Sequence, residues 1–194
     1  MSSRPVLEVR VTFLDRDPEL TVVCPGYELG RWRAEELARD VFDRHLLTFA
    51  LSYTEYADVS YDTAAQSLRK AAQAVYKTEK YSKRGEFGEL LLHSITRDIF
   101  GSEPAISKIY FKDAVNDTVK GYDAVHVVEI GGELELWLGE VKFYESLDQA
   151  IRDVTDELRV HLSIDYLRSV IAPQSGRAIA TGGVHTPRSC RRRP

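Results

Sequence analysis

The chain has 194 residues, of which 43% are hydrophobic and 29% charged, and its formal net charge at pH 7 is −4. These values are ordinary for a globular protein and suit one domain, or one domain with a small N-terminal extension. The negative net charge excludes overall attraction to nucleic acid, so any such binding must rely on a local basic patch.

The cysteines and the apolar stretches indicate in which cellular compartment the protein is expected. Cys24 and Cys190 share no CxxC spacing, which argues against a disulfide framework and against a zinc site. The start of the chain lacks an apolar core of signal-peptide length, and charges interrupt the long apolar stretches elsewhere. We therefore expect a cytoplasmic protein with no membrane partner.

The N-terminal third combines strand and helix patterns. Polar and apolar residues alternate over 6–14, which predicts a half-buried strand, and LTVVC at 20–24 is expected to be its hairpin partner. A helix with a broad apolar side is predicted from about 31 to 51. A second helix is predicted from about 60–62 to Gly85 or shortly before it.

Basic side chains cluster toward the end of this second predicted helix. One interpretation is a solvated helix face; the other is a surface that contacts the phosphate backbone of a nucleic acid. Under the second interpretation, the nucleic-acid-binding residues are Lys77, Lys80, Lys83 and Arg84.

From Gly85 onward the pattern is that of an α/β core. GEFGELLLHSITRDIFG predicts a helix closed by Gly101, and AISKIYFK at 105–112 predicts a strand. GYDAVHVVEI at 121–130 predicts a second strand, and the two glycines at 131–132 predict a tight hairpin turn. The order of elements indicates a helix, three strands and a final helix.

The third strand and the final helix follow this turn. ELELWLGEVKFY at 133–144 predicts the strand, and Ser146 is expected to cap a long helix over 147–171. Residues at helical spacing predict a buried stripe, formed by Leu147, Ile151, Val154, Leu158 and Leu162.

The hairpin turn predicts that two carboxylates face each other. With the turn at 131–132, residues whose numbers sum to about 263 lie opposite one another, so Asp123 lies opposite Glu140. Lys142 shares the face of Glu140 because strand side chains repeat every two residues. Two facing carboxylates repel each other unless a cation lies between them. The alternative is a charged pair on a solvated sheet edge.

Such a cluster suits metal-dependent phosphodiester hydrolysis. Mg²⁺, or Mn²⁺ in its place, takes oxygen ligands, stabilises the charge on the scissile phosphate and helps to deprotonate a bound water. A lysine beside the metal orients or activates the water and offsets the charge of the transition state. Glu86 or Glu89 of the preceding helix would complete the site, and helical periodicity does not choose between them.

The ordered set of Asp123, GEVK and two flanking helices resembles the PD-(D/E)xK nuclease superfamily. More narrowly, RGEFGELLLHSITRDIFG, ISKIYFKDAVNDTVKGYDAVHV and LWLGEVKFYES are similar to HamA, the effector family of the Hachiman anti-phage system. The resemblance covers roughly residues 80 to 170. It implies a metal-dependent DNase that acts on DNA with a helicase partner, HamB.

The resemblance also implies a fold and a set of roles. The fold is α/β, with a PD-(D/E)xK nuclease-like core of a helix, a three-stranded mixed sheet and a helix, preceded by an N-terminal β-hairpin and helical extension. Asp123 and Glu140 would bind the metal, Lys142 would serve catalysis, and Glu89 or Glu86 would supply the helical acid, Glu89 being the third metal ligand of the predicted set.

Several interpretations stay open at this level. A catalytically silent module that binds DNA or the helicase is the alternative function, and a restriction-type enzyme is disfavoured because no sequence-reading element is visible. Gln149 fits a capping box with Ser146 better than it fits the glutamine of some related nucleases. His93 and His126 lack metal-ligand spacing and are expected to be ordinary surface or half-buried residues.

We divide the chain into a hairpin and helical region (1–80), a nuclease-like core (81–172) and a disordered basic tail (173–194). The tail has almost no apolar periodicity and ends in a basic run. The family pattern carries more folded sequence here, so truncation or a shifted reading frame is one explanation. A natural disordered tail that contacts DNA is the other.

Overall fold

The structure is a computed structural model that describes residues 5–15, 17–76, 83–105 and 122–163. It begins with the predicted hairpin, in which β1 (Glu8–Phe13) pairs antiparallel with β2 (Leu20–Cys24). The predicted half-burial of the first strand is wrong, because every residue of β1 is exposed. A two-stranded hairpin leaves both faces open to solvent unless another layer covers one of them.

A second, shorter hairpin replaces the start of the first predicted helix. β3 (Tyr27–Glu28) pairs with β4 (Arg31–Trp32), and α1 (Ala34–Ala50) begins only after that pair. Two further helices follow, α2 (Tyr53–Ala57) and α3 (Ala64–Tyr76). α2 was not predicted, because a helix of five residues carries no hydrophobic period of its own.

The hydrophobic core lies where α1, α3 and α4 (Lys83–Phe100) meet. α1 supplies residues at spacings of three to five along one side, as the periodicity of its sequence predicts. The buried core residues are Leu37, Val41, Leu46, Phe49, Ala50, Leu51, Ala71, Val75 and Leu90.

α4 differs from its prediction at one end and agrees at the other. Gly85 lies inside the first turn of α4 and so does not end a helix there. Gly101 closes the helix as predicted, with φ of +65° and a hydrogen bond from its N–H to the carbonyl of Arg97 (3.1 Å). The left-handed conformation at this position is the one that glycine adopts without steric strain.

The three-stranded sheet has the order β5 (Glu103–Pro104), β6 (Ala124–Ile130) and β7 (Glu133–Gly139). The strand pairs that the structure describes are antiparallel, where a mixed sheet is predicted. The strand predicted at 105–112 lies outside the described residues except for its first residue.

The β6–β7 hairpin has the predicted turn and register. Both turn glycines have positive φ (+62° and +90°), and Ala124 lies opposite Gly139. β7 ends at Gly139, so Glu140 and Lys142 lie just past the strand rather than within it.

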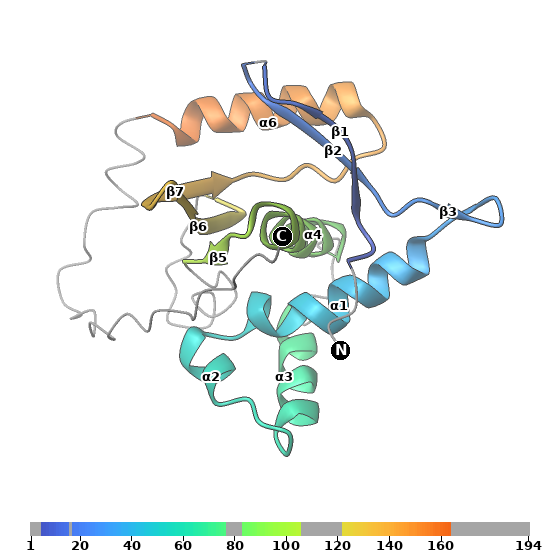
Figure 1. Cartoon of the computed structure of the whole chain (residues 1–194), viewed down its shortest axis with the longest axis vertical. Coiled ribbons are helices and arrows are strands. Elements are labelled where there is room, and N and C mark those ends of the chain that lie inside the picture. The colour runs from blue at the N-terminus through green and yellow to red at the C-terminus, as the bar shows by residue number, and fades with distance from the viewer. Residues whose placement is uncertain (1–4, 16, 77–82, 106–121, 164–194) are drawn as a thin grey trace, which may run out of the picture.

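The final helix α6 (Leu147–His161) and α4 lie on opposite sides of the sheet, as Figure 1 shows. Ser146 caps α6 as predicted, since its Oγ accepts the N–H of Gln149 (3.3 Å). The predicted buried stripe is wrong: no residue of α6 is buried, and Leu147 is 72% exposed. The contacts of α6 with the chain after β7 are made by polar side chains, Asp153, Glu157 and His161. The predicted tail at 173–194 lies outside the described residues.

A chain of buried histidines joins the core to the sheet. His93 Nδ1 lies 3.2 Å from His126 Nε2, and His93 Nε2 lies 3.0 Å from the hydroxyl of Thr48. His126 Nδ1 lies 2.7 Å from Ser102 Oγ. Both histidines are 3% exposed, so the prediction of surface or half-buried histidines is wrong. Their position between α4 and β6 is a tertiary fact that spacing does not reveal.

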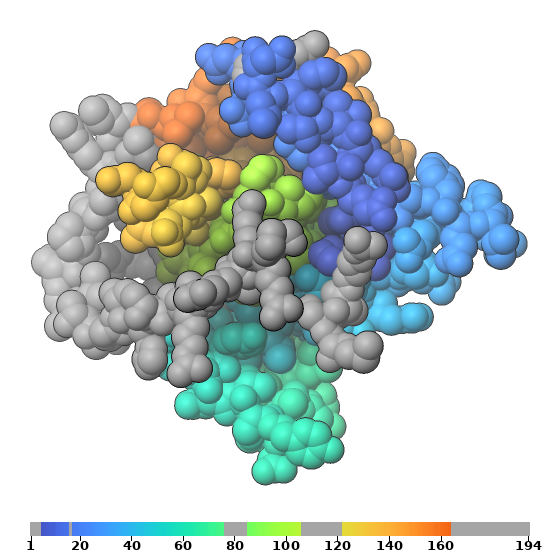
Figure 2. All heavy atoms as spheres, in the orientation of Figure 1, coloured from blue at the N-terminus to red at the C-terminus, as the bar shows by residue number. Residues whose placement is uncertain are grey.

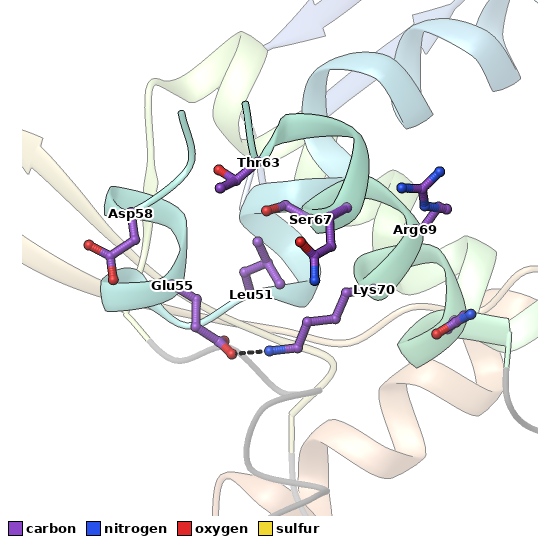
Figure 3. Close-up of a pocket in the computed structure, with 9 residues that line it drawn as sticks. Leu51, Glu55, Asp58, Thr63, Ser67, Arg69 and Lys70 are labelled. Atoms are coloured by element: carbon purple, nitrogen blue, oxygen red, sulfur yellow. Dashed lines mark hydrogen bonds and ion pairs between the residues drawn. The ribbon is translucent and has the colours of Figure 1, made fainter. Parts of the chain in front are cut away.

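The two ends of the molecule carry different features. Figure 2 shows the β1–β2 hairpin at one end of this face and α2 with α3 at the other. Between α2 and α3 lies a polar pocket of about 520 Å³, where Glu55 and Lys70 point toward each other and form an ion pair (Figure 3). The hydrogen bond from Lys70 lowers the pKa of Glu55 to about 2. None of the predicted site residues lines this pocket.

Candidate active site at the open end of the β6–β7 hairpin

Asp123 and Glu140 meet at the open end of the hairpin, opposite its glycine turn. The N–H of Asp123 donates to the carbonyl of Gly139 (2.8 Å), which continues the ladder by one step. The Asp123 carboxylate in turn accepts the N–H of Val141 (3.0 Å). The side chains of Asp123 and Glu140 are in hydrogen-bonding contact. The structure thus brings together the two acids that the register predicts to be neighbours.

The environment of Glu140 disfavours its charged form. Its side chain is only 4% exposed. Burial raises the pKa of Glu140 to about 7, the negative charge of Asp123 adds to the shift, and a hydrogen bond from His161 opposes it. A cation placed between the two carboxylates would relieve this repulsion.

Lys142 lies two residues beyond Glu140 and forms an ion pair with Glu157 of α6. Its side chain is 17% exposed. Partial burial acts to lower the pKa of Lys142, but the bond to Glu157 and the nearby charges of Tyr144 and Glu140 raise it overall. Lys142 is therefore a cation beside the two acids at neutral pH.

Two glycines let α4 approach this end of the hairpin closely. A Cβ added at Gly88 would lie 3.2 Å from Phe143 Cβ, and one added at Gly139 would lie 3.1 Å from the side chain of Leu92. Both distances are tighter than ordinary van der Waals contact. The absence of side chains at these positions brings α4 against Val141 and Phe143, beside the acids.

The helical acids Glu86 and Glu89 lie on α4 to either side of Gly88, and each has one buried carboxylate oxygen. In the described part of the chain, no three side chains of the types His, Cys, Asp and Glu are grouped so that they could hold one metal ion. The structure therefore does not gather Glu89 with Asp123 and Glu140 into a three-acid set. It also does not choose between Glu86 and Glu89.

Residues on α6 that contact the site were not predicted from the sequence. His161 Nδ1 lies 2.7 Å from Glu140 Oε1, and the hydroxyl of Tyr122 donates to the carbonyl of His161 (2.7 Å). Asp153, one stripe position further along α6, hydrogen-bonds the hydroxyl of Tyr144. The spacing of Asp153, Glu157 and His161, four residues apart, is the signal that could have revealed this stripe.

The proposed nucleic-acid-binding residues fall where the structure gives no side chains. Lys77 and Lys80 lie outside the described residues. Lys83 and Arg84 form the start of α4, but their side chains are not among those described. Their role in binding nucleic acid stays a prediction.

The pair of carboxylates fits a hard divalent cation. Mg²⁺ is usually held by one or two protein carboxylates and completes its shell with water and substrate phosphate. Asp123 and Glu140 provide two carboxylates in contact, and a cation between them would offset both the burial of Glu140 and the negative charge of Asp123, which together raise the pKa of Glu140.

A comparison with protein families places the chain. The model of the HamA family matches residues 4–174, which is most of the chain, and the chain belongs to this family. Membership connects it with the Hachiman anti-phage defence system. No curated protein and no solved structure matches the chain. Across the described residues, no helix is long and apolar enough to cross a membrane.

Proposed function

We propose that this chain is a Mg²⁺-dependent DNA nuclease of the PD-(D/E)xK type, the effector of a Hachiman defence complex. It hydrolyses phosphodiester bonds in DNA when it is activated together with a helicase partner, HamB. The observation that supports the proposal best is the contact between Asp123 and Glu140, with Lys142 beside them.

Each of these residues has a role that its position supports. Asp123 and Glu140 would hold the metal, which when bound would stabilise charge on the scissile phosphate. Lys142 brings a positive charge to the same face and would orient the attacking water and offset the charge that develops during hydrolysis. Glu86 or Glu89 would contribute the acid from α4. The phosphate backbone would be held by Lys77, Lys80, Lys83 and Arg84.

The decisive experiment compares DNA cleavage by alanine variants at the site, just past the end of β7, with cleavage by an alanine variant at the start of β7. Glu140→Ala and Lys142→Ala should each abolish Mg²⁺-dependent cleavage of DNA by the purified chain with its helicase partner. Glu133→Ala, an exposed acid at the start of β7, is the matched control and should cleave like the wild type. Cleavage that survives in both site variants would contradict the assignment of the site.

One observation favours a second candidate, a catalytically silent module that binds DNA or the helicase. Glu140 and Lys142 are both engaged by α6 within the chain, through His161 and Glu157. The same contacts would be expected if Glu140 and Lys142 served only to hold α6 against the sheet. Under this alternative, the wild-type chain binds its partner but cleaves no DNA with Mg²⁺ or Mn²⁺, and the alanine variants lower stability only.

A further inference from the structure

The extended segment after β7 sends alternate side chains to two different helices. Val141 and Phe143 face α4, where both lie against Gly88. Glu140, Lys142 and Tyr144 face α6. The alternation is that of an extended chain, in which successive side chains point to opposite sides.

On the α6 side, the three contacts form a regular series. Glu140 meets His161, Lys142 meets Glu157, and Tyr144 meets Asp153. Two residues of extended chain span about 6.6 Å, and four residues of α-helix span about 6.0 Å, so the two rows of side chains stay in step. We call these six residues the 140–161 ladder.

The chemistry of the ladder fixes its register. Each of its three pairs joins a hydrogen-bond donor to an acceptor, namely imidazole to carboxylate, ammonium to carboxylate and phenol to carboxylate. Sliding α6 by one turn in one direction would set Glu140 against Glu157. Sliding it the other way would set Lys142 against His161. The first shift opposes two carboxylates and the second sets an ammonium against an imidazole, so the observed register is the one in which all three pairs join a donor to an acceptor.

Two of the three residues on the extended side are the proposed site residues Glu140 and Lys142. His161 engages Oε1 of Glu140, and the side chain of Asp123, the other proposed metal ligand, contacts the same carboxylate. A partner of this kind fixes the orientation of a ligating side chain, and its loss typically weakens metal affinity or activity by about 10- to 100-fold. Glu157 in the same way limits the rotamers of the long Lys142 side chain.

We propose that His161 and Glu157 are positioning residues for the nuclease reaction: His161 orients the Glu140 carboxylate toward the metal, and Glu157 orients the Lys142 ammonium. This inference rests on the proposed nuclease function and goes beyond it, because it assigns α6 a part in the chemistry. Neither residue touches the reacting atoms.

The test uses two amides that differ only in reach. His161→Asn places an N–H donor where Nδ1 lies, whereas His161→Gln places it one bond further out, where Nε2 lies. Both variants are neutral and polar, so burial and charge are matched between them. For Lys142, Glu157→Gln keeps an acceptor oxygen and Glu157→Ala removes it. Asp156→Ala is the control on the same helix, because Asp156 pairs only with Arg159 in the described contacts and is 73% exposed.

Two readouts are measured on the full chain. The first is the affinity for Mn²⁺, by isothermal titration calorimetry on the chain alone. The second is kcat and KM for DNA cleavage with the helicase partner. His161→Gln should weaken Mn²⁺ binding and lower kcat by about 10-fold or more, with KM for DNA unchanged, while His161→Asn stays within about threefold of the wild type. Glu157→Ala should lower kcat about 10-fold without changing Mn²⁺ affinity, and Glu157→Gln and Asp156→Ala should change neither.

The outcomes separate this inference from the proposed function. If the wild-type chain cleaves DNA but His161→Gln matches His161→Asn in both readouts, His161 is a structural tie and the positioning role is wrong. Increased activity in His161→Gln or Glu157→Ala would also overturn it, because it would mean that α6 restrains the site. If the wild-type chain neither binds Mn²⁺ nor cleaves DNA, the nuclease proposal itself fails.

Discussion

The buried histidines and the acid pair lie on opposite faces of the same short sheet. His126 projects from β6 toward α4 and meets His93, whereas Asp123 and Glu140 face α6. Both regions bury ionisable groups, but in different ways. In the hydrogen-bonded series through His93 and His126, each acceptor faces a donor. In the acid region, two like groups, Asp123 and Glu140, are in contact.

The hydrogen bonds of the histidine region determine its tautomers. The hydroxyl of Thr48 donates to the carbonyl of His45 (3.0 Å), so its oxygen accepts the Nε2–H of His93. Neutral His93 then accepts the Nε2–H of His126 at its Nδ1, and His126 accepts the hydroxyl proton of Ser102 at its own Nδ1. A network in which all members are satisfied rigidifies a core.

The two regions therefore respond to pH in opposite directions. Burial lowers the pKa of His126 to about 4 and that of His93 well below its usual value, with nearby positive charge adding to both shifts. Between about pH 4 and 6.5 the folded chain binds fewer protons here than the unfolded chain does, so this region gains stability as pH rises. Glu140 has a raised pKa, so from pH 4.5 to about 7 its contribution to stability falls as pH rises. At neutral pH the histidine side of the sheet therefore stabilises the fold, whereas ionisation of Glu140 destabilises the acid side.

The largest expected effect is on the histidine side. His126→Leu would leave Ser102 and His93 without their shared partner in a dry site, at a cost of about 2–4 kcal/mol in the free energy of unfolding. In a chain of this length that corresponds to a fall in Tm of roughly 5–15 °C. Thermal unfolding at pH 7 and pH 4.5 checks it, and the gap to the wild type should shrink at the lower pH. A variant as stable as the wild type at pH 7 would show that the network contributes nothing.

The next effect concerns the two glycines of α4. Gly85→Ala places its new methyl group in open space and should stabilise the chain by about 0.5–1 kcal/mol through helix propensity. Gly88→Ala gains the same propensity but meets Phe143 Cβ at 3.2 Å, so over-packing of about 1–3 kcal/mol should outweigh it. The difference in stability between these two variants therefore measures the effect of the close approach of α4 to the site.

Urea unfolding and DNA cleavage measure this difference. Gly88→Ala should be the less stable variant and should also cleave more slowly, because the displaced 141–143 segment carries Lys142. Equal stability of the two alanine variants would mean that α4 adjusts without moving the segment.

A smaller effect of opposite sign is expected on the acid side. Glu140→Gln removes one of two repelling carboxylates, so the free energy of unfolding at pH 8 should rise by about 1 kcal/mol, or roughly 2–4 °C in Tm. The gain should disappear as pH falls toward 4.5, because Glu140 is then neutral in the wild type as well. Under the proposed function, cleavage should drop at least about 100-fold in the same variant. A loss of stability at pH 8 would show that the hydrogen bond from His161 outweighs the repulsion.

The acid pair could be predicted from the sequence because its geometry is local. Two glycines at 131–132 set a two-residue turn, the turn sets the register, and the register places Asp123 beside Glu140. Gly101 as a helix stop and Ser146 as a cap were predicted for the same reason, since each depends on a few neighbouring residues.

The contacts of both regions with other elements could not be predicted. His93 and His126 are 33 residues apart, and only the packing of α4 on β6 brings them together. The position of α6 along the 140–144 segment is likewise set by tertiary contacts, so the apolar stripe of α6 was assigned to the buried side. Short elements such as α2 and the β3–β4 hairpin escaped prediction because they are too short for a hydrophobic period to repeat within them.

The smallest single effect is expected for Leu134→Thr, which is compared with a threonine substitution on the other face of the hairpin. Leu134 lies on the face of β7 that Glu140 continues and is 75% exposed, whereas Val128 of β6 is 5% exposed on the face toward α4. Val128→Thr buries a hydroxyl and should cost about 1–2 kcal/mol. Leu134→Thr loses little burial, and a β-branched residue suits a strand, so stability should change by less than about 0.5 kcal/mol.

Urea unfolding at pH 7 compares the two variants directly. A cost for Leu134→Thr as large as that for Val128→Thr would mean that the α6 face of the hairpin is covered in solution. In that case the acids would lie beneath a packed layer, and the site could reach DNA only after that layer moves. A cost near zero would show that this face is open to solvent at the start of β7, where Leu134 lies.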